Sequence, residues 1–235
     1  MVRTVHVLGL QRLGTNYLAE LCRLNLGGVA VLPSGDRTVC WKHALPGEAT
    51  RNASHTGLSA GDALRARPDV TALLICKHPF NWIASLRRNP ADLFLKRPAL
   101  LGEGEPDIGG LMGLYADYYG GWLDLLNARG GYLTFRYEQA LAEPLAAVTA
   151  VAGEAGVMAP ERVETLAKAP FSRTFRESDR RRYADFAHGL SPENVRAVEA
   201  HWPAALLARM GYGAPSRRGR LFERLRTLWS GAPRR

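Results

Sequence analysis

Three apolar runs along the chain indicate strands that are buried on both faces. Residues 2–8 and 70–76 are nearly continuous stretches rich in β-branched side chains, and residues 132–137 form a shorter run. Runs without polar alternation are typical of parallel strands covered by helices. Residues 29–32 and 39–41 are two further short strand candidates.

Helical periodicity fills most of the intervals between these runs. One helix is predicted to begin at about Thr15 and to end at the Gly27-Gly28 pair, and Ser191 with Pro192 marks the start of another that runs to about Met210. The other helices are expected at residues 61–66, 80–88, 111–128, 144–155 and 160–167. Strands that alternate with helices predict an α/β fold, a single three-layer domain over residues 1–214 with a central, mostly parallel sheet. Ligands of such folds bind at the carboxyl ends of the strands.

The turn between the first strand and the first helix is a candidate anion site. Gly9 and Gly14 allow backbone angles that other residues resist, so the turn directs N–H groups and a helix N-terminus at one point. Arg12 adds a positive charge inside the turn, and Thr15 and Asn16 add side-chain donors at the first helical turn. This combination predicts a phosphate-binding loop.

The residues around this loop argue against nucleotide hydrolysis or kinase chemistry. A nucleotide P-loop, G-x-x-x-x-G-K-[ST], requires Lys directly after the second glycine, where this chain has Thr15. Phosphoryl-transfer enzymes also hold Mg²⁺ with a carboxylate at the end of a neighbouring strand, whereas Lys77 follows the run 70–76. The pattern therefore favours a transferred group whose charge is balanced by protein cations, and no metal is expected.

Four segments, in order, resemble those of sulfotransferases that use 3′-phosphoadenylyl sulfate (PAPS). Arg12-x-Gly14-Thr15 resembles the loop for the 5′-phosphosulfate, and residues 77–86 resemble the segment for the 3′-phosphate. Residues 136–144 are similar to a run common after a later strand of these enzymes, and the helix within 190–212 also closes many of them. The resemblance covers roughly residues 2–213 and implies a P-loop-like sulfotransferase fold with PAPS as the sulfuryl donor.

The resemblance also implies which residues hold the donor. The 5′-phosphosulfate would be held by Arg12, Leu13, Gly14, Thr15 and Asn16. Lys77 and Ser85 would bind the 3′-phosphate, and Arg181, in the arginine-rich stretch 171–183, would close over the nucleotide. Lys77 stands where the family has Arg, and a lysine cannot form the bidentate fork of a guanidinium.

Residues 41–46 resemble the Lys-x-His-Leu-Pro stretch of cytosolic sulfotransferases, with Lys and His adjacent here. The resemblance implies that Lys42 contacts the sulfuryl group, that His43 takes the acceptor proton and that Arg12 neutralises the bridging oxygen. Adjacent residues of a strand point to opposite faces, so Lys42 and His43 share a site only if the strand has ended. A polar strand end without a catalytic role is the alternative. Rival bases are His6, His55 and Glu48.

Charge and cysteine content bound the partners. Seven Arg and one Glu in residues 216–235 supply +6 of the formal net charge of +9, so the main body is only mildly basic. That body suits a small phosphorylated ligand, and no nucleic-acid partner is expected. Residues 215–235 form a basic amphipathic pattern that fits either peripheral contact with an anionic membrane or a solvated tail. Three cysteines without pairing and no signal-peptide pattern predict a cytoplasmic protein.

The predicted function is transfer of a sulfuryl group from PAPS to a hydroxyl of a small-molecule or glycan acceptor, with a glycolipid suggested by the tail. Two alternatives stay open: a P-loop small-molecule kinase with a rearranged loop, and a non-catalytic nucleotide-binding module. The acceptor pocket is expected in the variable loops 50–60 and 89–110, which do not identify the acceptor. The sequence predicts no oligomeric state.

Overall fold

Four parallel strands form the centre of the fold. The computed structural model describes residues 3–33, 39–50, 57–88, 97–100, 106–165 and 189–213. The strands are β1 (Arg3–Leu8), β2 (Val29–Val31), β3 (Val70–Cys76) and β4 (Tyr132–Arg136), in the order β2-β1-β3-β4. Leu8 pairs with Leu74 and Cys76 pairs with Arg136, so β1, β3 and β4 all end at one edge of the sheet. The predicted parallel sheet is confirmed.

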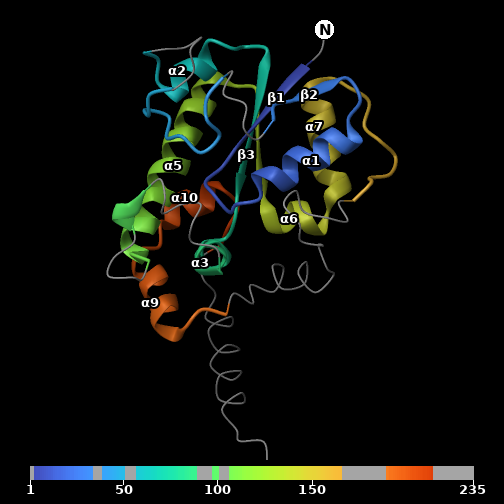
Figure 1. The fold of residues 1–235 in the computed structure, drawn as a ribbon. Helices are drawn as coiled ribbons and strands as arrows, with labels where there is room; N and C mark the ends of the chain where they lie inside the picture. Colours follow the sequence, from blue (N-terminus) through green and yellow to red (C-terminus); the bar gives the residue numbers. More distant parts are fainter. Residues whose placement is uncertain are drawn as a thin grey trace, which may run out of the picture.

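Helices cover both faces of this sheet and complete a three-layer α/β domain (Figure 1). On one face, α1 (Thr15–Asn25), α6 (Tyr137–Ala142) and α7 (Pro144–Ala155) bury one hydrophobic cluster with the strands. The other face packs against α5 (Ile108–Arg129), and a second cluster there also includes residues of α2 (Ala60–Arg65) and α3 (Pro79–Arg88). A short 3₁₀ helix, η2 (Pro98–Leu100), precedes α5.

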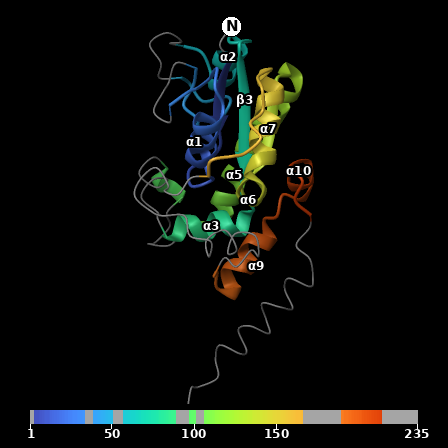
Figure 2. The same cartoon turned by 90° about the vertical axis from the view of Figure 1, so that its right-hand side faces the viewer.

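The chain closes with α9 (Pro192–Ala200) and α10 (Ala204–Arg209). Both views place α3 below the carboxyl end of β3, with α9 beyond it (Figures 1 and 2). Ser191 caps α9 by accepting a hydrogen bond from the Asn194 backbone, as its position before Pro192 predicts. The single helix predicted to reach Met210 is wrong, because Pro203 interrupts the run and leaves two shorter helices.

Two other predictions about elements need correction, and one helix was missed. Residues 39–41 form no strand: Val39 and Cys40 are fully buried in the core, so burial without strand pairing explains the apolar run. No helix covers residues 160–165, the described part of the stretch predicted at 160–167. Helix α6 was not predicted, since it begins directly where β4 ends.

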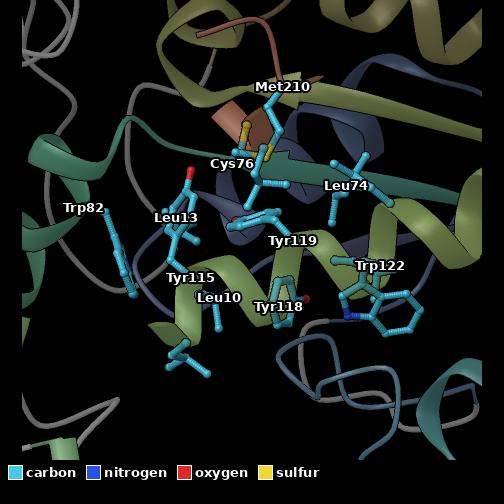
Figure 3. Packing of buried hydrophobic residues seen from close by; sticks show 14 of the residues in the cluster. Leu10, Leu13, Leu74, Cys76, Trp82, Tyr115, Tyr118, Tyr119, Trp122 and Met210 are labelled. Carbon is cyan, nitrogen blue, oxygen red and sulfur yellow. The ribbon is translucent and has the colours of Figure 1, made fainter. Parts of the chain in front are cut away.

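The aromatic residues of α5 are core residues, as their spacing predicts (Figure 3). Each also donates a hydrogen bond from its polar atom to a backbone carbonyl. Tyr115 reaches Lys77 at 2.9 Å, Tyr118 reaches Lys42 at 2.6 Å, Tyr119 reaches Ile75 at 2.7 Å and Trp122 reaches Ala44 at 2.9 Å. Helix α5 therefore holds two segments at the carboxyl edge of the sheet.

The three cysteines, Cys22, Cys40 and Cys76, are buried and form no disulfide. Burial raises the pKa of each thiol to about 12, so all three are protonated and unreactive at neutral pH. No helix in the described segments combines the length and the apolar character needed to cross a membrane. The tail 215–235 lies outside the described residues, and its membrane contact stays a prediction.

Candidate functional site

The loop between β1 and α1 is closely packed against its neighbours. A Cβ added to Gly14, whose φ is +92°, would lie 2.1 Å from Cδ2 of Tyr137. A Cβ added to Gly9 would lie 2.7 Å from the carbonyl oxygen of Ile75. Arg12 adopts a φ of +68°, a strained conformation for a residue that carries a side chain. Both glycines are therefore needed where they stand, and the loop brings Arg12 to the surface beside the N-terminus of α1.

The Lys42-His43 turn is tied directly to this loop. The Gly9 backbone N–H donates to the Lys42 carbonyl at 3.1 Å, and His43 Nδ1 hydrogen-bonds the Gly9 carbonyl oxygen. Lys42 Nζ donates to Asn16 Oδ1 at 2.5 Å, across the first turn of α1. Residues 42 and 43 lie in a turn rather than a strand, and their side chains contact Asn16 on α1 and Gly9 in the loop. The condition under which the two residues share one site is met.

Lys42 is a buried cation at this point. Lys42 is only 8% exposed. Burial lowers the pKa of its ammonium to about 8, and the nearby positive charge of Arg23 makes a smaller contribution. A depressed lysine pKa means that the charged form is disfavoured until an anion approaches. The ammonium of Lys42 is thus placed to gain from an anionic ligand at the N-terminus of α1.

Lys77 lies beneath the loop rather than at its surface. Its Nζ donates to the Arg12 carbonyl at 2.7 Å and lies 4.1 Å from the centre of the Tyr137 ring. Burial lowers the pKa of Lys77 to about 7, although the nearby Glu138 carboxylate opposes this shift. Lys77 therefore supports the strained backbone of Arg12. Its contact with a 3′-phosphate, together with that of the buried Ser85 in α3, stays a prediction.

A buried carboxylate at the end of β4 was missed by sequence reasoning, which considered only the end of β3. Glu138 Oε1 accepts hydrogen bonds from the His78 backbone at 3.0 Å and from Asn81 Nδ2 at 2.8 Å, and Oε2 accepts one from the Tyr212 hydroxyl at 2.7 Å. The signal was present, because Glu138 follows an apolar run that ends at the same sheet edge. With three donors, this carboxylate anchors α3 and the C-terminal segment.

The remaining candidates fall into three groups. Leu13 is fully buried in the core, so only its backbone could face a ligand. His6, a rival base, is a core residue next to Cys40, and Glu48 forms an ion pair with Arg97 at 3.0 Å. Arg181, the stretch 171–183 and His55 lie outside the described residues.

A shallow hollow of about 510 Å³ is lined in part by the residues that follow the Lys42-His43 turn in the sequence. Its walls are the segment 45–48, Arg97 and two residues of α5, Asp117 and Gly121. Two loops, 50–60 and 89–110, are expected to bind the acceptor. The first follows segment 45–48 closely, and Arg97 belongs to the second; the larger part of each loop is outside the described residues.

Comparison with models of known protein families and with curated proteins finds no match for this chain. The site itself combines three basic residues, Arg12, Lys42 and Lys77, with a glycine loop and a helix N-terminus.

Proposed function

We propose that the protein is a PAPS-dependent sulfotransferase that moves a sulfuryl group to a hydroxyl of a small-molecule or glycan acceptor. The observation that carries the proposal is the convergence on one glycine loop of Arg12, Lys42 and Lys77. The 2.5 Å contact from Lys42 Nζ to Asn16 Oδ1 brings a cation to the N-terminus of α1, where an anion is best stabilised. Together these three positive charges would balance the negative charge of the phosphates and the sulfate of PAPS.

The chain supplies a base and charge stabilisation for this reaction. The Gly9 carbonyl can only accept, so Nδ1 of a neutral His43 carries the hydrogen and Nε2 carries the lone pair. Nε2 would take the proton of the attacking hydroxyl. PAPS would supply the sulfuryl group, and adenosine 3′,5′-bisphosphate would leave. Arg12 and Lys42 would stabilise the negative charge that develops on the bridging oxygen as the S–O bond breaks.

The kinase alternative is weakened by the surroundings of Glu138. Phosphoryl transfer in P-loop enzymes uses a strand-end carboxylate to hold Mg²⁺. Glu138 is the carboxylate at the end of β4, and its two oxygens already accept three hydrogen bonds within the fold. Binding a metal there would break the anchor of α3.

A thermal-shift measurement tests the donor site. Adenosine 3′,5′-bisphosphate is expected to raise the melting temperature, and ATP with Mg²⁺ is expected to raise it much less. Arg12→Ala should reduce the bisphosphate shift, whereas Arg65→Ala, which removes an exposed arginine paired with Asp62 on α2, should leave it unchanged. A shift with ATP and Mg²⁺ alone would favour the kinase, and a shift with neither ligand would overturn the proposal.

Transfer of label from [³⁵S]PAPS separates the enzyme from the non-catalytic module. His43→Ala should retain the bisphosphate shift and lose transfer, because it removes the base and leaves the cations in place. A wild-type protein that binds the bisphosphate but labels no acceptor in any extract would be a binding module.

A further inference from the structure

The backbone around His43 is fixed on both sides. The Ala44 N–H donates to the Trp41 carbonyl at 2.9 Å and closes a turn over residues 41–44. The carbonyls of Lys42 and Ala44, on either side of His43, accept hydrogen bonds from two aromatic side chains of α5. The start of the His43 side chain is therefore held in place, and its two torsions alone decide where the imidazole points.

A single hydrogen bond leaves the plane of this imidazole loosely set. The second side-chain torsion of histidine has only a broad preference. His43 Nδ1 hydrogen-bonds the Gly9 carbonyl oxygen, but a carbonyl oxygen accepts over a broad range of directions, so the ring can tilt about this contact. A tilt changes the direction of the lone pair on Nε2, which is the atom that would take the acceptor proton. A base aimed at one proton therefore needs a second contact on its ring.

Trp41 supplies that second contact. Its indole lies perpendicular to the His43 imidazole, with ring centroids 5.2 Å apart and an interplanar angle of 88°. Perpendicular pairs at this separation are favourable, because the positive edge of one ring meets the negative face of the other. Trp41 is itself anchored, since it packs against the hydrophobic cluster that contains the aromatic residues of α5. A different imidazole plane would lose the ring pair or displace the indole from the cluster.

We propose that Trp41 is a positioning residue that fixes the plane of the His43 imidazole and so aims Nε2 at the acceptor hydroxyl. The inference rests on the proposed sulfotransferase function, because that function makes His43 the base. Gly9 fixes which nitrogen carries the hydrogen, and Trp41 fixes where the other nitrogen points. Trp41 acts through His43 and needs no contact with the reacting atoms. Proton transfer depends on such alignment, and a misplacement of about 1 Å can cost about 100-fold in rate.

NMR of the histidine Cε1–H groups tests the contact without any acceptor. The His43 signal is the one that disappears in His43→Ala. In the wild type it should show a nuclear Overhauser effect to the Trp41 indole, and Trp41→Leu should shift it by removing the ring current. The matched control is Trp202→Leu, because Trp202 packs against His78 with centroids 5.3 Å apart. That variant should shift the His78 signal and leave the His43 signal in place.

Transfer from [³⁵S]PAPS tests the consequence for catalysis. The acceptors are 2-naphthol and methyl glucoside, with a cell extract at fixed concentration if neither is labelled. Trp41→Leu should lower kcat about 10-fold and leave the KM for PAPS unchanged, because the donor cations stay in place. It should also keep the thermal shift with adenosine 3′,5′-bisphosphate. Trp41→Phe keeps an aromatic ring beside the imidazole and should restore most of the rate.

Several results would overturn the inference. Absence of the nuclear Overhauser effect in the wild type is one, and it requires no variant to fold. An unchanged kcat in Trp41→Leu is another, as are equal losses in Trp41→Leu and Trp41→Phe. A raised KM for PAPS at unchanged kcat would assign Trp41 to the donor. Failure of the proposed function is separate, because then the wild type shows no thermal shift with the bisphosphate or labels none of the acceptors, whatever the NMR result.

Discussion

Raising the pH should weaken donor binding, because it removes the charge of Lys42. Burial lowers the pKa of this ammonium to about 8 in the free protein. An anionic ligand requires the protonated form, so the fraction of protein that can bind falls as the pH rises through this value. Phosphate monoesters, whose second pKa is about 6, are already about nine-tenths doubly ionised at pH 7, so their own titration adds little in this range.

The magnitude follows from the pKa. With a pKa of about 8, the protonated fraction of Lys42 falls from about 0.9 at pH 7 to about 0.1 at pH 9, a tenfold loss of affinity or about 1.4 kcal/mol. If the ligand also requires the charge of Lys77, whose pKa is about 7, the combined loss is about 500-fold. The change of affinity with pH therefore shows how many of the two lysines must be charged for the ligand to bind.

Isothermal titration with adenosine 3′,5′-bisphosphate at pH 7, 8 and 9 and fixed ionic strength measures this slope. Lys42→Arg is the matched variant, since its guanidinium stays charged throughout the range and should remove the tenfold component. The stability of the unliganded protein should change in the opposite direction. Between about pH 8 and 10.5 the unfolded chain binds more protons at Lys42 than the folded chain, so stability rises with pH. An affinity that is constant from pH 7 to 9, or a slope identical in Lys42→Arg, would refute the reasoning.

Three further predictions concern the loop and its supports. Gly14→Ala should lower the free energy of unfolding by about 2–5 kcal/mol in urea titration, because the added methyl group meets the Tyr137 ring at positive φ. Gly28→Ala is the control: its φ is +77° but its surroundings are open, so it should cost only about 1–2 kcal/mol. Equal losses in the two variants would contradict the packing argument. Arg12→Gly should relieve strain and raise stability by about 1 kcal/mol while weakening bisphosphate binding in calorimetry, and a stability loss would show that no strain was stored. Tyr212→Phe removes one donor to the buried carboxylate and should cost about 1–3 kcal/mol in the same urea assay, with no loss expected if that contact is absent in solution.

Local sequence patterns predicted most of the fold. Strands β1, β3 and β4 are continuous apolar runs in the sequence, because they are buried on both faces. Gly9 and Gly14 mark the loop, because close packing at these two positions excludes a side chain. The failures come from cases in which tertiary contacts decide. Residues 39–41 have the composition of a strand but are buried without a pairing strand.

The site, like the fold, was predicted only where its residues are close together in the sequence. The loop residues are contiguous, so their chemistry is visible in the sequence. The contact between Lys42 and Asn16 joins residues 26 positions apart, and only the packing of the chain brings them together. The position of Glu138 at the sheet edge can be inferred from the sequence, but the three hydrogen bonds that it accepts cannot, because burial and partners are properties of the fold.

The tyrosines of α5 have a consequence for the charge pattern of the site. Tyr115 holds the Lys77 carbonyl and Tyr118 holds the Lys42 carbonyl, so the two lysine backbones are attached to one helix three residues apart. Three residues of α-helix advance about 4.5 Å along the axis, a distance that no loop rearrangement alters. The offset between the two lysine-bearing segments is thus set by the pitch of α5. A different spacing of the two lysines would therefore require a change in α5 as well as in the loop.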